Sequence, residues 1–246
     1  MATTVRDLAK MIDHSLLHPT MNDVELSSGC ELARRYDTAS VCIKPYAVKR
    51  AAELLAGSEV KVGTVCAFPH GNSPTRIKAA EAQQAVDDGA DEVDMVINIG
   101  KALSGEWEYV RREIELLNKM VVDGGAILKV IFENDFLKDD QIVKLSEMCS
   151  EEGVAFIKTS TGYGFTKREG GMYAYDGATS ADLKLMLQHA APGVQVKAAG
   201  GIRTLEDLLR VKALGVTRVG ATATAAILDK ARGLIDEGIE LEGLIE

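Results

Sequence analysis

Eight short runs of strand-forming residues alternate with longer stretches of helical apolar spacing along this chain of 246 residues. Most of the short runs are apolar on both faces, which is typical of parallel strands covered by helices. Eight strand–helix units in one chain favour an α/β fold closed into a (β/α)₈ barrel, the TIM barrel. The expected strands are 13–17, 40–43, 61–68, 92–98, 127–132, 155–159, 195–198 and 218–221.

Helical patterns fill the intervals, and several end in glycines suited to a left-handed cap, at Gly57, Gly89, Gly153 and Gly215. The expected helices are 25–36, 47–55, 76–86, 109–120, 140–151, 181–189, 205–213 and 224–235, with a short additional N-terminal helix at 5–11. A doubly wound open sheet is the alternative, but its usual Gly-rich turn is absent after the first strand. With no linker or composition shift, residues 1–246 are predicted to form a single catalytic domain.

Composition excludes several classes of protein. The chain carries 28 Lys and Arg against 37 Asp and Glu, a net charge of −9 without a basic run, which argues against a nucleic-acid partner. No apolar stretch is long enough to cross a membrane and the first residues lack a signal segment, so a cytoplasmic location is expected. The four cysteines are widely spread without a Cys-x-x-Cys pair, which suits reduced thiols better than disulfides or zinc.

Two lysines, Lys158 and Lys197, each stand at the end of an apolar run that reads as a buried strand. In a (β/α)₈ barrel the carboxyl ends of the strands carry the active site. Asp94, inside another expected strand, is predicted to face the same interior. Burial and mutual repulsion disfavour two ammonium groups, so one amine is expected to be neutral and nucleophilic near pH 7.

A neutral buried amine can form a Schiff base with an aldehyde or ketone, so lysine-based carbon–carbon bond chemistry is the functional interpretation. The alternative is structural, with a strand-end lysine that reaches solvent or pairs with Asp94. Lys129 is a third strand lysine, for which a structural or electrostatic role beside Asp94 is expected. No metal or cofactor is predicted. His14 and His18 have the four-residue spacing of a metal-binding pair on a helix, but they lie in an expected strand and loop.

Two turns suit a phosphate group. The double glycine at Gly200 and Gly201 precedes a helix with Thr204 as its expected N-cap. The last strand–helix turn offers Gly220, Ala221 and Thr222. These positions match the common phosphate site after strands seven and eight of a barrel, although either turn alone could be a plain connection.

Seven segments together resemble the deoxyribose-phosphate aldolases, a class I aldolase family of the (β/α)₈ class. The matching segments are 12–20, 40–45, 68–71, 92–98, 128–133, 156–162 and 196–203. The resemblance implies reversible cleavage of 2-deoxy-D-ribose 5-phosphate into acetaldehyde and D-glyceraldehyde 3-phosphate. It also implies a Schiff base on Lys158, with Lys197 lowering its pKa and Asp94 relaying protons.

The same resemblance implies the substrate-binding residues. Cys42 matches a cysteine near the family's active site, and Asp13 an aspartate that contacts substrate hydroxyls. Backbone N–H groups of Gly200, Gly201 and Gly220 would hold the phosphate. Thr159 and Thr222 complete the candidate set.

Two features depart from the family pattern. Residues 163–176 are inserted after Lys158-Thr-Ser-Thr-Gly162. This insertion could form a lid, contact the phosphate, narrow the pocket or be a solvated surface loop. In the last turn the family commonly has two serines, where this chain has Thr222 and Ala223. Thr222 keeps the hydroxyl group and Ala223 lacks it. Thr224 or the insertion could compensate for the missing hydroxyl. The tail 241–246 also lacks the terminal tyrosine of some members.

Three functional hypotheses follow. The first is a Schiff-base aldolase that takes a small phosphorylated sugar or aldehyde and works without a cofactor. The second is a related lysine-dependent aldolase or acyl-transfer enzyme with another phosphorylated substrate. The third is a non-catalytic sugar-phosphate-binding barrel. The sequence leaves the oligomeric state open, and a homodimer is the commonest form of assembly among such proteins.

Overall fold

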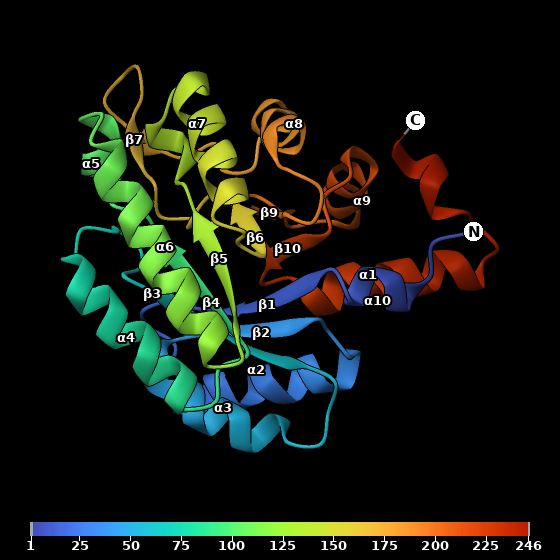
Figure 1. Ribbon diagram of the computed structural model, residues 1–246. Coiled ribbons are helices and arrows are strands. Elements are labelled where there is room, and N and C mark those ends of the chain that lie inside the picture. The colour runs from blue at the N-terminus through green and yellow to red at the C-terminus, as the bar shows by residue number, and fades with distance from the viewer. Residues whose placement is uncertain (1, 246) are drawn as a thin grey trace.

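The computed structural model describes residues 2–245, and Met1 and Glu246, the two ends of the predicted domain, lie outside the described residues. Eight parallel strands close into a barrel in the order β1-β10-β9-β6-β5-β4-β3-β2, which confirms the predicted (β/α)₈ fold (Figure 1). The barrel strands are β1 (Ile12–Leu16), β2 (Ser40–Ile43), β3 (Lys61–Cys66), β4 (Glu92–Val96), β5 (Ile127–Ile131), β6 (Phe156–Lys158), β9 (Gln195–Ala199) and β10 (Arg218–Ala221).

Helices surround the barrel, and Figure 1 shows the N-terminal helix alongside the last long one. They are α1 (Val5–Ala9), α2 (Asp23–Tyr36), α3 (Val48–Leu55), α4 (Thr75–Asp87), α5 (Ile99–Leu103), α6 (Trp107–Asp123), α7 (Asp139–Glu151), α8 (Ser180–His189), α9 (Leu205–Leu214) and α10 (Thr224–Asp236), with 3₁₀ turns η1 (Pro45–Ala47), η2 (Asn134–Phe136) and η3 (Leu241–Ile245). Within residues 2–245 no helix is both long and apolar enough to cross a bilayer.

Four predicted strands are too long. Strand β6 spans Phe156–Lys158 and not 155–159, and at β3, β4 and β5 the chain leaves the barrel earlier than its apolar residues suggest. After β3, Ala67 adopts a left-handed conformation with φ of 53°. After β4, Asn98 caps α5, a helix absent from the prediction, and its side-chain oxygen accepts from the Lys101 N–H. After β5, Glu133 is left-handed with φ of 60°.

The apolar core lies between the barrel and the helices, not inside the barrel. On β4, Val93 and Met95 are fully buried in this core. The alternate residues Glu92 and Asp94 form ion pairs across the barrel interior. Strand β4 is therefore an exception to the apolar pattern expected of most strands, because neighbouring strands supply cations that compensate its buried carboxylates.

The insertion is not an irregular loop, since it contains two short antiparallel strands, β7 (Thr166–Lys167) and β8 (Tyr173–Ala174). Thr166 pairs with Ala174 and Lys167 with Tyr173. This inserted hairpin, residues 163–176, lies between β6 and α8 in the chain and projects from the barrel (Figure 1).

His14 provides a test of the packing between β1 and α10. Its ring is buried, and Nδ1 lies 2.8 Å from the hydroxyl of Thr224, the first residue of α10. Burial lowers the pKa of His14 to about 4. The unfolded chain takes up this proton near pH 6.5 and the folded protein only near pH 4, so acidification across this interval should remove about 3 kcal/mol of stability.

We therefore expect His14→Gln to show a shallower loss of unfolding free energy between pH 7 and pH 4 than the parent protein. Urea denaturation at each pH measures this difference. His18→Gln, which removes an exposed histidine, is the control. Equal slopes for the parent and His14→Gln would contradict the assignment.

Candidate active site

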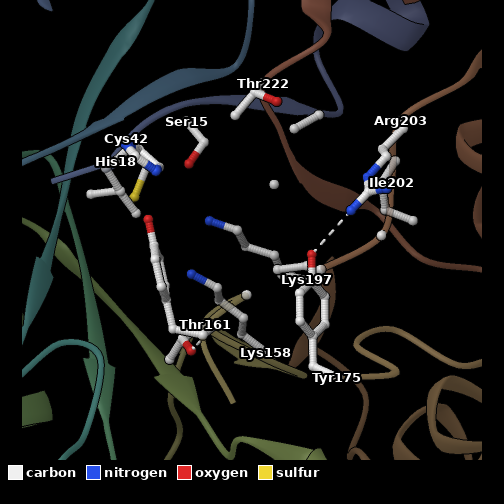
Figure 2. A pocket seen from close by; sticks show the side chains of 18 of the residues that line it. Ser15, His18, Cys42, Lys158, Thr161, Tyr175, Lys197, Ile202, Arg203 and Thr222 are labelled. Carbon is white, nitrogen blue, oxygen red and sulfur yellow. Dashed lines mark hydrogen bonds between the residues drawn. The ribbon is translucent and has the colours of Figure 1, made fainter. Parts of the chain in front are cut away.

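The register of β6 and β9 brings the two strand-end lysines together. Lys158 lies directly opposite Lys197 in this parallel pair, so both side chains enter the same layer of the barrel. Figure 2 shows the two amines side by side, pointing into one cavity. Lys197 is fully buried and Lys158 is 3% exposed, so neither ammonium group can be hydrated as on a surface.

Asp94 is the carboxylate that joins these amines. Its Oδ2 accepts from Lys158 Nζ at 2.8 Å and from Lys197 Nζ at 2.7 Å. Lys129, opposite Asp94 in the β4–β5 pair, approaches the other oxygen, Oδ1, at 3.2 Å. The predicted roles of Lys129 beside Asp94 and of Asp94 inside the barrel therefore have a geometric basis.

A second layer of charges lies beneath, around Asp13. Its Oδ2 is 2.5 Å from Lys197 Nζ and 2.9 Å from Lys129 Nζ, and its Oδ1 is 2.6 Å from Arg218 Nη1. Glu92 completes this layer, with contacts of 2.5 Å to Lys129 and 3.1 Å to Arg218.

The charges of this network distinguish the two lysines by the number of carboxylates that each contacts. The network holds three carboxylates, Asp13, Glu92 and Asp94, and four basic groups, Lys129, Lys158, Lys197 and Arg218. The charges balance when one amine is neutral. Lys158 has an ion-pair contact with Asp94 alone, whereas each of the other three bases contacts at least two carboxylates.

The pKa shifts also distinguish the two lysines. Burial lowers the pKa of Lys158, and repulsion from Lys197 adds to the effect against the attraction of Asp94. Burial also disfavours charge on Lys197, but Asp13 and Asp94 together outweigh it and raise the Lys197 pKa. Burial opposes ionisation of Asp94 too, but Lys129, Lys158 and Lys197 hold its pKa below the usual range. The arrangement favours the uncharged amine more strongly on Lys158 than on Lys197, and it favours the ionised form of Asp94.

A cavity of about 390 Å³ opens above the two amines. Cys42 reaches it from β2, but burial raises the pKa of its thiol to about 11, so the sulfur stays protonated. The cavity is lined by Ser15, Leu17, His18, Met21, Cys42, Lys158, Thr161, Gly162, Tyr163, Phe165, Tyr175, Lys197, Ala199, Gly200, Gly201, Ile202, Arg203, Gly220, Ala221 and Thr222.

The predicted phosphate turns lie together at one end of this cavity. Gly200 and Gly201 have φ of 86° and 88°, a left-handed conformation that suits glycine and opens the turn. Gly220 and Thr222 contribute from the end of β10. Thr204 caps α9, as predicted, with its side chain accepting from the Asp207 N–H.

Three sequence candidates do not line the cavity: Asp94, which is buried against the two amines, Asp13 and Thr159. Asp13 is fully buried in the lower charge layer, where Ser40, Lys129, Lys197 and Arg218 occupy its oxygens. The Thr159 hydroxyl is also buried, and it donates to the Ala199 carbonyl and accepts from the Ala199 N–H, both at 3.0 Å. Asp13 and Thr159 are therefore buried beside the site, and their predicted contact with substrate stays a prediction.

Sequence reasoning missed several residues of the cavity wall, among them Ser15, His18 and Arg203. Arg203 could have been found, because it follows Gly200-Gly201-Ile202 directly and adds a cation to a turn already selected for phosphate. Tyr163 and Tyr175 belong to the insertion, for which the sequence leaves a lid or a narrowing of the pocket open, and both line the cavity.

Comparison with known proteins gives one family. The model of the DeoC/LacD family aldolases matches residues 8–233. The deoxyribose-phosphate aldolase of Rhodopirellula baltica is 50% identical over 226 residues, covering 92% of this chain and 90% of that protein. The deoxyribose-phosphate aldolase of Thermococcus gammatolerans is 41% identical, covering 92% of this chain and 97% of that protein.

Solved structures agree with the sequence comparison. The tetrameric deoxyribose-phosphate aldolase of Aeropyrum pernix superposes with a TM-score of 0.83 at 28% identity, covering 94% of this chain and 93% of that one. An aldolase designated QR15 superposes with a TM-score of 0.84 at 31% identity, covering 94% and 98% of the two chains.

Proposed function

The chain belongs to the DeoC/LacD family of aldolases, and on that premise we propose that it reversibly cleaves 2-deoxy-D-ribose 5-phosphate to acetaldehyde and D-glyceraldehyde 3-phosphate. This makes it a lyase of the class I type, with Lys158 as the Schiff-base residue. The observation that carries the proposal is the buried charge network, in which Lys158 pairs with one carboxylate, Lys197 pairs with two, and both amines line one cavity.

Schiff-base formation starts from the free amine. Lys158 donates an N–H to Asp94 Oδ2 at 2.8 Å, so its lone pair is left for the aldehyde carbon of the open-chain sugar. Attack gives a carbinolamine, and loss of water gives the iminium ion. The positive charge of Lys197 beside it disfavours protonation of the free amine before attack.

Cleavage then breaks the bond between C2 and C3 of the sugar. The C3 hydroxyl gives up its proton, D-glyceraldehyde 3-phosphate leaves as the aldehyde, and the bonding electrons move into the iminium to form an enamine. Protonation of the enamine at C2 and hydrolysis release acetaldehyde and restore Lys158. We assign proton relay to Asp94, held in place by Lys129 and Lys197.

The phosphate occupies the other end of the cavity. Backbone N–H groups around Gly200, Gly201 and Gly220 suit an anion, and the Thr222 hydroxyl adds a donor. Arg203 provides the positive charge at this end. Cys42 is assigned to the wall of the reacting centre, and Asp13 and Thr159 act indirectly by fixing Lys197 and the β6–β9 junction.

Turnover of the pure protein tests the function. We expect deoxyribose 5-phosphate to yield acetaldehyde and glyceraldehyde 3-phosphate in equal amounts, measured by coupled dehydrogenase assays without added metal. A panel of other phosphorylated sugars tests the alternative of a related aldolase with a different substrate. Binding without turnover of any of them would favour the non-catalytic barrel.

The proposal extends to assembly and location. An oligomer is expected, of which the homodimer is the simplest form. A cytoplasmic location suits a protein with four free, buried cysteines, Cys30, Cys42, Cys66 and Cys149. Size-exclusion chromatography with light scattering measures the assembly.

A further inference from the structure

The inserted hairpin is fixed at both ends by two carboxylates that follow β5. Glu133 is 1% exposed and accepts from the Thr161 N–H at 3.1 Å and from the Thr161 hydroxyl, just before the hairpin begins. Asp135 accepts from the N–H groups of Asp176 and Gly177 at 2.5 and 3.1 Å, where the hairpin ends. These hydrogen bonds fix the insertion as a part of the cavity wall.

The second end of the hairpin also contacts the candidate phosphate turn. The Ala178 N–H donates to the Gly200 carbonyl at 3.1 Å. The backbones approach so closely that a Cβ on Gly177 would lie 2.6 Å from the Gly200 oxygen, and a Cβ on Gly200 would lie 3.1 Å from the Gly177 Cα. A shift of the hairpin's end therefore moves the phosphate turn with it.

Tyr175 is the hairpin residue that faces the positive charge of this end. Arg203 donates through Nη2 to the Tyr175 hydroxyl at 3.4 Å, and both residues line the cavity (Figure 2). Phe165 supports the Tyr175 ring edge-on, with centroids 5.4 Å apart. The Arg203 side chain is otherwise long and exposed, so this contact limits the positions that its guanidinium samples.

The last strand–helix turn supplies little else to bind an anion through a side chain. Thr224 is fully buried and its hydroxyl lies 2.8 Å from His14 Nδ1, so it cannot replace the hydroxyl that Ala223 lacks. The cavity-lining side chains beside these turns that carry donors are Thr222, Arg203 and Tyr175, and the Tyr175 hydroxyl already accepts from Arg203.

We propose that the inserted hairpin is a specificity element for the phosphorylated end of the substrate, in which Tyr175 is a positioning residue that holds Arg203 toward the phosphate. This inference rests on the proposed function for the identity of the phosphorylated substrate. Arg203 contacts the phosphate, and Tyr175 acts through Arg203. The hairpin therefore changes discrimination between phosphorylated and non-phosphorylated sugars and leaves the chemistry at Lys158 unchanged.

The test compares Tyr175→Phe with Tyr173→Phe, which removes a hydroxyl from an exposed residue of the same hairpin. We expect Tyr175→Phe to raise KM for deoxyribose 5-phosphate about 3- to 10-fold, the usual effect of one hydrogen bond, with kcat unchanged. For 2-deoxyribose, which lacks the phosphate, kcat/KM should stay at the parent value. Tyr173→Phe should match the parent protein on both substrates.

A double-mutant cycle with Arg203→Met separates positioning from packing. If Tyr175 acts through Arg203, Tyr175→Phe should have little further effect in the Arg203→Met background. An equal loss on both sugars, or full additivity with Arg203→Met, would overturn the inference and leave Tyr175 with a packing role alone.

Thermal protection by inorganic phosphate provides a readout that needs no turnover. We expect phosphate to raise Tm less in Tyr175→Phe than in the parent protein. If the parent cleaves no deoxyribose 5-phosphate but this difference is present, the proposed function fails and the positioning role stands. If the parent cleaves it and Tyr175→Phe is indistinguishable in KM and in protection, the positioning role fails alone.

Discussion

Lys158→Leu is expected to reduce kcat by on the order of 10⁴-fold or more, because the covalent route through the Schiff base is lost together with its nucleophile. Leucine has a similar size without the amine, and in a network that balances with Lys158 neutral its folding cost should be small. Reductive trapping provides the direct measurement. Borohydride with acetaldehyde should label the parent protein at the peptide that contains Lys158 and leave Lys158→Leu unlabelled.

Lys167→Met is the matched control, since Lys167 is an exposed lysine on the nearby hairpin. This variant should keep parent activity and trapping. Residual turnover near the parent level in Lys158→Leu would rule out the lysine mechanism. Stable labelling of Lys197 in place of Lys158 would reverse the order of the two amines that the charge network indicates.

Lys197→Met and Asp94→Asn are expected to shift the pH dependence of kcat/KM in opposite directions. Loss of the Lys197 cation leaves three carboxylates against two permanent cations and removes repulsion from Lys158, so the Lys158 pKa should rise. Loss of the Asp94 charge leaves an excess of cations, so the Lys158 pKa should fall. The free amine reacts, and activity rises with pH through this pKa, so the acidic limb should move to higher pH in Lys197→Met and to lower pH in Asp94→Asn.

Both variants should also lower the rate at pH 7. We expect about 10²-fold or more for each, through protonation of Lys158 in Lys197→Met and through loss of proton relay in Asp94→Asn. Each breaks a buried ion pair, which costs about 3–5 kcal/mol of stability, so urea denaturation must show that the variants are folded at the assay temperature. Shifts in the same direction would contradict the charge balance.

The sequence predicted the barrel well because strand and helix periods are local properties of the chain. The β2 and β10 ranges agree with the prediction, and each predicted helix overlaps a helix of the structure. The errors at the ends of β3, β4 and β5 come from apolar residues that continue past the point where the backbone turns away, at Ala67, Asn98 and Glu133. An apolar side chain can pack in a turn as well as in a strand, so composition alone does not mark the boundary.

The conformation of the inserted hairpin could not be predicted from the sequence. Its 14 residues, 163–176, contain no strong strand signal, and whether they form a lid, a contact or a solvated loop was open from the sequence. The structure shows a hairpin that is fixed by contacts between distant segments, Glu133 with Thr161 and Asp135 with Asp176. These carboxylates lie in the turn after β5, and their partners lie on either side of the insertion.

The sequence by itself determined the closed parallel barrel, the two strand-end lysines and the glycine turns, because each depends on residue type and on spacing along a single strand or turn. It indicated that one amine should be neutral, and only resemblance to a family suggested which. The tertiary structure decided how many carboxylates each base meets across the barrel, and this number supports the proposed order of the lysines. Asp94 alone pairs with Lys158, whereas Asp13 and Asp94 both pair with Lys197. Such counts depend on the register of strands far apart in the chain, which no local pattern encodes.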